Sequence, residues 1–64
     1  MTGIKVKREE AGLTQEELSR ILGVVRQTVA MWETGKAAPS ANMLPRIARA
    51  LNCRIEELYG EPED

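Results

Sequence analysis

The sequence predicts an all-α domain. Its apolar residues recur at intervals of three and four, and no segment alternates strictly between apolar and polar residues. Aromatic residues, which strands favour, make up only 3% of the 64 residues. A chain of this length has room for one domain with a single small core, burying about 60% of its unfolded surface. We therefore expect one helical domain over residues 1–60, followed by an acidic tail over residues 61–64 that is disordered.

The first helix is expected from Ile4 to Glu10 or Ala11. Residues three and four positions apart share one face of a helix, which places Ile4, Arg8 and Ala11 on an inward stripe. Gly12 then supplies the left-handed residue that ends the helix.

The second helix, from Gln15 to Leu22, has a start that is specified twice. Thr14 and Glu17 form a capping box, in which the threonine hydroxyl accepts one unpaired backbone N–H and the glutamate carboxylate accepts another. Leu13 and Leu18 occupy the flanking positions of a hydrophobic staple. Gly23 ends this helix. Its inward face is expected to hold Leu18, Ile21 and Leu22.

A sharp corner follows the second helix. Only residues 23–25 separate it from a third helix over Arg26 to Thr34, and so short a connection joins two packed helices at an angle. In the third helix Val29 and Trp32 point into the core, and Gly35 ends it. Four residues are left on its opposite, exposed side: Arg26, Gln27, Ala30 and Met31.

The start of the fourth helix depends on Pro45, which has no backbone N–H. Proline is tolerated in the first turn of a helix, and with Ser40 as the N-cap Pro45 lies just past that turn. An Asn42 cap instead places it among residues whose N–H groups have no partner. The first residue of this helix therefore stays open between Ala41 and Met43.

A last short helix is expected from Ile55 to Tyr59, after a left-handed stop at Asn52. The inward residues of the fourth helix are Leu44, Ile47, Ala48 and Leu51. The last helix is expected to cover the core with Ile55, Leu58 and Tyr59.

The composition excludes several classes of function. There is no histidine and a single cysteine, Cys53, so the chain can form no Cys/His zinc site, internal disulfide or Ser-His or Cys-His nucleophile pair. Its apolar runs are too short for a signal peptide or a membrane span. We therefore expect a cytoplasmic protein that is no enzyme, binds no metal or cofactor and contacts no membrane. Cys53 is expected to be a small buried hydrophobe rather than a redox sensor.

Two short helices joined by a turn with a glycine form a helix-turn-helix. The stretch LTQEELSRILGVVRQTVAMWETGKAAPS, over residues 13–40, resembles the Cro and phage-repressor (XRE) family of DNA-binding domains, and the resemblance extends over residues 4–60. The L-T-Q-x-x-L start, the turn glycine, the R-Q-T run, the W-E-x-G-K exit and the P-S dipeptide carry it. It implies a five-helix, lambda-repressor-like fold of the stand-alone bacterial type, with the second and third helices as the helix-turn-helix.

The resemblance also implies roles for individual residues. The positions that meet base edges in the major groove hold Arg26, Gln27, Ala30 and Met31. The positions that contact DNA phosphates hold Gln15, Thr28, Thr34 and Lys36. The chemistry agrees, because arginine bridges guanine, glutamine bridges adenine, and alanine or methionine packs on the thymine methyl group. Arg8 and Glu33 occupy the positions of a partly buried ion pair, which we interpret as structural.

Several positions depart from the family pattern. Val25 replaces the usual Ser or Thr N-cap of the third helix, with an expected loss of about 1 kcal/mol of capping. Met31 replaces a polar residue, and Ala37 and Ala38 lie in a loop that is often polar or basic. These departures favour an alternative function, in which the same fold is a protein-interaction module or an antitoxin-like partner.

The net charge of −1 argues against a nucleic-acid partner, since phosphate neutralisation usually requires a basic surplus. Three of the ten acids lie in residues 61–64, however, so residues 1–60 carry +2. We expect a sequence-specific transcriptional regulator, a repressor, that binds a palindromic operator in double-stranded DNA as a homodimer. The modest charge predicts weak binding by a monomer and a shallow salt dependence. The candidate dimer-surface residues are Val6, Leu58 and Tyr59.

Overall fold

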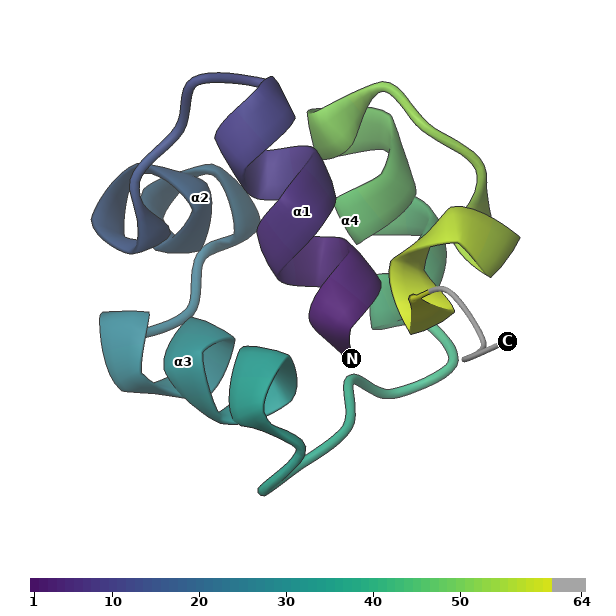
Figure 1. The fold of residues 1–64 in the computed structure, drawn as a ribbon. Coiled ribbons are helices and arrows are strands. Elements are labelled where there is room, and N and C mark those ends of the chain that lie inside the picture. Colours follow the sequence, from purple (N-terminus) through teal and green to yellow (C-terminus); the bar gives the residue numbers. More distant parts are fainter. Residues whose placement is uncertain (61–64) are drawn as a thin grey trace.

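Four α-helices and one 3-10 helix make up residues 1–60, which are the residues that the computed structural model describes (Figure 1). In chain order they are α1 (Thr2–Glu10), α2 (Gln15–Leu22), α3 (Arg26–Thr34), α4 (Met43–Leu51) and η1 (Ile55–Tyr59). These residues contain no strand, which confirms the all-α class. The expectation of five α-helices is corrected, because the last element is a 3-10 helix, the usual form for so short a piece. The expected tail, residues 61–64, lies outside the described residues.

Helix α1 begins two residues earlier than expected, at Thr2 rather than Ile4. The reason is a tertiary contact, since the amino group of Met1 donates a hydrogen bond to the carbonyl oxygen of Trp32 and so ties the chain end to α3. Gly12 adopts the expected left-handed conformation. Ala11 is exposed, not inward, because it follows the last helical residue and no longer lies on the inward stripe.

The expected capping box at the start of α2 is present. The backbone N–H of Glu17 donates to Thr14 Oγ1 at 3.0 Å, and the N–H of Thr14 donates to Glu17 Oε1 at 2.8 Å. Ile21 was expected on the inward face but is 53% exposed. Ser19 is buried on the inward face of α2 instead. Its hydroxyl donates a hydrogen bond to the carbonyl of Glu16, so this polar group has a partner inside the protein.

Helix α4 begins at Met43, within the expected range. Ser40 satisfies its first N–H groups, because the N–H of Met43 bonds to both the carbonyl and the hydroxyl of Ser40, whereas the Asn42 side chain makes no capping bond. Pro45 therefore lies in the first turn, where its missing N–H has no cost. Asn52 ends the helix in the expected left-handed conformation, with φ at 56°.

One apolar core lies between the helices. Within residues 1–60 its buried members are Ile4, Leu18, Leu22, Val29, Trp32, Ile47, Ala48, Leu51 and Leu58. Leu44 and Cys53 are half-buried and pack against this core, so Cys53 is less buried than expected.

Helix η1 covers the core with only one of the three residues expected to do so. Leu58 is fully buried, whereas Ile55 and Tyr59 are exposed, Tyr59 by 60%. A 3-10 helix turns by a third of a revolution per residue, so Tyr59 points away from the face of Leu58, and Ile55 is not among the apolar residues packed on the core. The burial of Leu58 also removes it from the candidate dimer surface.

A close approach between α1 and η1 gives a test of this packing. A Cβ on Gly3 would lie 2.6 Å from the carbonyl carbon of Leu58 and 2.7 Å from the nitrogen of Gly60, and would overlap the carbonyl oxygen of Glu57. We expect Gly3→Ala to lower the free energy of unfolding by about 3 kcal/mol or more, measured by urea denaturation. Gly12→Ala is the control: φ there is +75° with nothing within 4 Å of the added Cβ, so only backbone strain of about 1–2 kcal/mol is expected. Equal losses in the two variants would contradict this packing.

Candidate nucleic-acid interface

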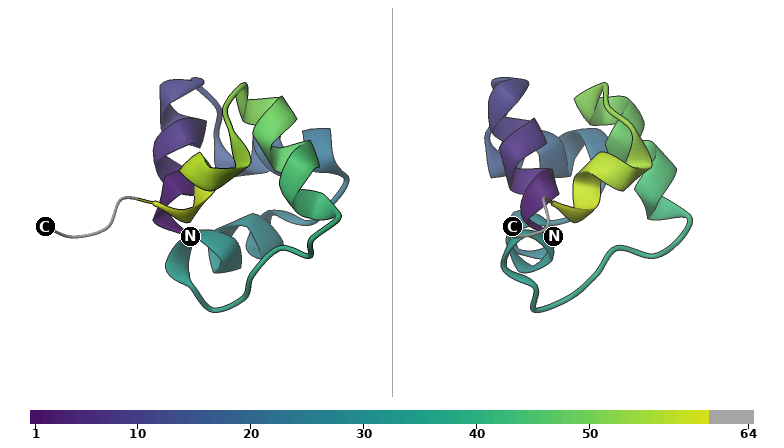
Figure 2. Two further views of the ribbon diagram at one scale, coloured as in Figure 1. Left: turned by 90° about the vertical axis from the view of Figure 1, so that its right-hand side faces the viewer. Right: turned by 45° about the vertical axis from the view of Figure 1, so that its right-hand side comes forward.

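Helices α2 and α3 form a helix-turn-helix. Gly23 is left-handed, and the N–H of Val24 returns to the carbonyl of Ser19 at 3.0 Å, which turns the chain within three residues. Helix α3 lies below α1 and α2 in Figure 1, and residues 35–42 run along the same edge of the molecule. In both views of Figure 2, α3 lies at the lower edge, and residues 35–42 lead from it up to α4. The outer side of α3 is therefore presented at one edge of the domain.

The outer side of α3 has a shallow depression. Its hollow is lined by Gln27, Ala30, Met31, Thr34 and Lys36. Gln27 is exposed, whereas Ala30 and Met31, expected on the exposed side, are half-buried. Five of the eight residues expected to contact DNA thus border one surface, which we call the α3 hollow.

Three of the expected contact residues, Gln15, Arg26 and Thr28, are not among those that line the α3 hollow. Arg26 is exposed at the first position of α3, and Thr28 is half-buried in its first turn. Thr34 borders the hollow, but its hydroxyl donates to the carbonyl of Ala30 at 3.0 Å. None of the ion pairs found within residues 1–60 involves Arg26 or Lys36. Among the described residues no carboxylate therefore neutralises these two cations.

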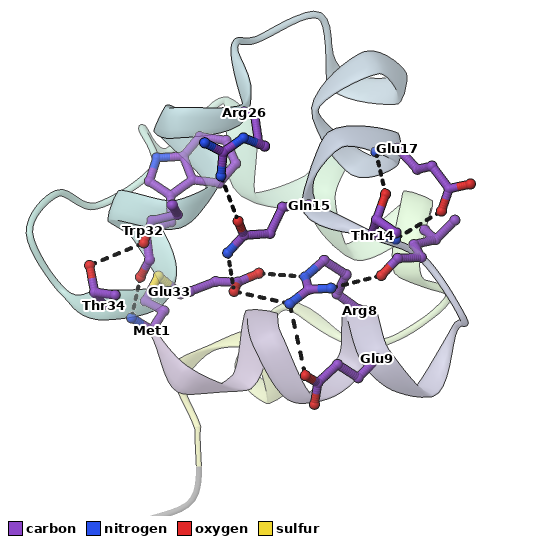
Figure 3. A network of polar contacts seen from close by, with 12 residues as sticks. Met1, Arg8, Glu9, Thr14, Gln15, Glu17, Arg26, Trp32, Glu33 and Thr34 are labelled. Atoms are coloured by element: carbon purple, nitrogen blue, oxygen red, sulfur yellow. Dashed lines mark hydrogen bonds and ion pairs between the residues drawn. The ribbon is translucent and has the colours of Figure 1, made fainter.

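Behind this surface, Arg8 of α1 and Glu33 of α3 form a buried ion pair (Figure 3). Arg8 Nε lies 2.7 Å from Glu33 Oε2, and its Nη2 donates to Glu33 Oε1 at 3.2 Å. Its remaining nitrogen, Nη1, donates to the carbonyl of Leu13 at 2.7 Å. The hydrogen bond to Glu33 raises the pKa of Arg8. The structure thus brings together the two residues expected to pair and satisfies both charges.

Gln15 links the ion pair to the surface, a role that the sequence reasoning missed. Its Nε2 donates to Glu33 Oε1 at 3.0 Å, and its Oε1 accepts from Arg26 Nη1 at 3.3 Å (Figure 3). Gln15 is the first residue of α2 and Arg26 the first of α3. A signal was available, because the corner of a helix-turn-helix brings the two helices into contact.

Val25 stands at the N-cap of α3 and makes no side-chain hydrogen bond there. It is 68% exposed, so the first N–H groups of α3 open to the surface beside an apolar side chain. Ala37 and Ala38 are also exposed, in the segment that follows α3. The departures from the family pattern therefore lie around the α3 hollow.

Cys53 follows the C-terminal end of α4 and does not line the α3 hollow. Burial raises the pKa of its thiol, which disfavours the reactive thiolate. The residues described by the structure hold no group of three or more His, Cys, Asp or Glu side chains that could bind a metal. No described helix is both long and apolar enough to cross a membrane.

Comparison with known proteins identifies the family. A family model described as helix-turn-helix matches residues 4–58. The chain belongs to this helix-turn-helix family. It is of the XRE type, as the resemblance implied.

Relatives of this helix-turn-helix chain match it over most of their length. A protein of Methanothermobacter thermautotrophicus is 47% identical over 64 residues, which cover 98% of this chain and 93% of that protein. One from Archaeoglobus fulgidus is 45% identical over 58 residues, covering 91% and 83% of the two chains. Both are described as HTH-type transcriptional regulators.

The fold also matches part of a longer protein. The crystal structure of Fe(II) HppE in complex with substrate superposes with a TM-score of 0.80 and 32% sequence identity. The match covers 98% of this helix-turn-helix chain but only 41% of that chain. The same fold thus occurs in more than one kind of protein, and function has to be argued from the site.

The buried ion pair yields a test of stability. Glu33→Ala leaves the Arg8 guanidinium buried without its partner, and we expect a loss of about 3–5 kcal/mol in the free energy of unfolding, measured by urea denaturation. The control is the double variant Arg8→Met/Glu33→Leu, which replaces both charges by apolar groups and should recover most of the loss. A loss below about 1 kcal/mol in the single variant, as for a surface ion pair, would contradict the buried pairing.

Proposed function

We propose that this chain is a transcriptional regulator that binds double-stranded DNA and reads the major groove with α3. The observation that carries the proposal is the α3 hollow at one edge of a helix-turn-helix, together with two cations that pair with no carboxylate among the described residues: Lys36, which lines the hollow, and Arg26, the first residue of α3. Relatives described as HTH-type transcriptional regulators support it. No catalytic group is required, and the family is not one of enzymes.

Base readout is assigned to the outer residues of α3. The guanidinium of Arg26 bridges guanine O6 and N7, and the amide of Gln27 bridges adenine N6 and N7. Ala30 and Met31 are half-buried, so their side chains protrude little from α3. They offer an apolar surface that fits a thymine methyl group. Arg26 and Gln27 are adjacent at the start of α3, where a recognition helix reaches into the groove.

Phosphate contacts are assigned to donors around this reading face. Lys36 supplies a cation, and Thr28 and Thr34 supply hydroxyl groups, although that of Thr34 first has to leave the Ala30 carbonyl. Gln15 uses one amide N–H for Glu33 and keeps a second for a phosphate. With so few cations, binding relies on geometry more than on charge.

The proposed binding unit is a homodimer on a palindromic operator. One copy measures 34 × 23 × 21 Å and contains one recognition helix, whereas half-sites recur about every 34 Å along DNA. Reading two such half-sites therefore requires two copies. Val6 and Tyr59 remain the candidate dimer contacts because both are exposed, whereas Leu58 is buried. A small domain bound to an operator acts most directly by keeping other proteins off the DNA, so we propose that this chain is a repressor.

A second candidate function is a protein-interaction module or antitoxin-like partner. The exposed Val25 and the exposed pair Ala37 and Ala38 give the binding edge an apolar border that DNA does not need. In this function the α3 hollow packs against protein, and no duplex is selected.

The first experiment selects duplexes from a randomised pool and measures their binding by fluorescence anisotropy. We expect the wild-type chain to select one palindromic sequence. The variant Arg26→Ala/Gln27→Ala should lose about 5- to 150-fold of discrimination for each bidentate base contact removed. Selection of no sequence above background, or of the same sequence by the double variant, would show that α3 does not read the groove.

Salt dependence separates phosphate contacts from base contacts. Lys36→Ala should weaken binding to selected and unrelated duplexes alike and should make the slope of log K against log salt shallower by about 0.9. Gln27→Ala serves as the matched control, because it removes no charge and should leave the slope unchanged. An unchanged slope in Lys36→Ala would exclude a phosphate contact there.

The dimer is tested by sedimentation with and without the selected duplex. We expect two copies per palindromic duplex and one copy on a duplex with a single half-site. Tyr59→Ser should shift assembly to higher concentration, whereas Ile21→Ser, at another exposed position, on α2, should not. A single copy on the full palindrome at every concentration would contradict the dimer.

A further inference from the structure

The three methionines of the chain, Met1, Met31 and Met43, lie in different surroundings. All three are half-buried, but Met1 and Met43 pack against the apolar core, whereas Met31 is not among the apolar residues of the described chain that pack on it. Met31 lines the α3 hollow instead. We propose that Met31 is a site of reversible oxidation by peroxide, and that its sulfoxide weakens DNA binding. This inference rests on the proposed function, in which Met31 contacts a base pair.

Access to the sulfur atom distinguishes Met31 from the other two methionines. Oxidation requires a peroxide to approach the thioether, and packing against the core hinders that approach at Met1 and Met43. The α3 hollow lies on the surface of the domain, so Met31 can be reached from solvent. Met31 is therefore the methionine that we expect peroxide to oxidise first.

The reaction transfers one oxygen atom to the side chain. A lone pair of Met31 Sδ attacks one oxygen of hydrogen peroxide, so that an S–O bond forms and the O–O bond breaks. The proton on the transferred oxygen passes to the departing hydroxide, which leaves as water. The thioether is oxidised and the peroxide is reduced, and methionine sulfoxide reductases restore the thioether with a thiol as the reductant.

The sulfoxide oxygen changes what the α3 hollow offers to DNA. A thioether is apolar, whereas a sulfoxide is polar and accepts hydrogen bonds. The same hollow is lined by Gln27, Thr34 and Lys36, which carry an amide, a hydroxyl and an ammonium donor. A sulfoxide at Met31 either draws one of these donors away from DNA or stays unpaired against a thymine methyl group. Both outcomes weaken binding.

The backbone at Met31 keeps this effect local. The carbonyl of Met31 accepts the N–H groups of Gly35 and Lys36, the second at 3.0 Å, and these bonds close the C-terminal end of α3. Oxidation adds an oxygen atom to the side chain and leaves them in place. The helix-turn-helix therefore keeps its fold while its reading face changes.

Cys53 is the other side chain that contains sulfur, and its surroundings disfavour the same role. Peroxide reacts with the thiolate, and burial disfavours that form by raising the pKa of the Cys53 thiol. Cys53 does not line the α3 hollow, so its oxidation would not alter the reading face directly.

Treatment with hydrogen peroxide, followed by mass spectrometry and fluorescence anisotropy, tests the inference. We expect Met31 to gain an oxygen atom before Met1 and Met43 do, and the selected duplex to slow this gain at Met31 alone. The affinity of the oxidised wild-type chain for that duplex should fall about 5- to 150-fold, the range expected for a polar group buried without a partner. Treatment with methionine sulfoxide reductase and a thiol should restore the affinity.

Met31→Leu supplies the variant that peroxide cannot oxidise at this position. Each variant is compared with its own untreated sample, so a change in the basal affinity of Met31→Leu cancels, and we expect no loss on treatment. Met43→Leu and Cys53→Ser are the matched controls, because both retain Met31 and should lose affinity as the wild type does. The oxidised wild-type chain should keep the free energy of unfolding of the untreated chain, measured by urea denaturation.

Three results would overturn the inference and leave the proposed function intact. The first is an equal loss of affinity in treated Met31→Leu, which would place the sensitive group elsewhere. The second is full affinity in a chain that is oxidised at Met31, and the third is unfolding of the oxidised chain. If the untreated wild-type chain selects no duplex, the proposed function fails and the inference fails with it.

Discussion

The ion pair between Arg8 and Glu33 is the interaction on which the arrangement of the helices depends. Two charges placed in an apolar core cost several kcal/mol each unless they are paired and hydrogen-bonded. Here the guanidinium meets the carboxylate through two bonds and the carbonyl of Leu13 through a third. Among the described residues no buried side-chain N or O atom lacks a partner. The pair therefore joins α1 to α3 and anchors the chain at the point where α2 begins.

The apolar core around this pair is small, and local signals supplement it. A domain of this length buries little surface, so its stability is marginal and each element has to be specified by its own ends as well as by packing. The capping box of Thr14 and Glu17 starts α2, and left-handed residues stop α2, α3 and α4. These devices hold short helices at defined lengths. The helix-turn-helix is thereby kept rigid enough to present a side chain such as Arg26 in one place.

The positions of the charged residues on the fold matter more for DNA binding than the net charge of the chain. The total of −1 is unfavourable for a partner made of phosphates, yet the cations at the edge of α3 are free of carboxylate partners within residues 1–60. Glu57, by contrast, lies on η1 beside Lys7, and its pKa is lowered mainly by the backbone N–H of Arg54. The two cations without a carboxylate partner thus lie at α3, whereas Lys7 on α1 is paired with Glu57 on η1, and the total charge of the chain does not reveal this difference.

The sequence by itself determined the bounds of α2 and α3, the left-handed stops and the core positions Val29 and Trp32, because each depends on signals within a few residues of the chain. It also identified the family and the residues around the α3 hollow through the order of its motif. Contacts between segments decided the rest. They determined the early start of α1 against Trp32, the exposure of Ile21 and Tyr59, and the bridge that Gln15 makes between Glu33 and Arg26. The physical reason is that helix ends are encoded by neighbouring residues, whereas the burial and partners of a side chain depend on which distant elements pack against it.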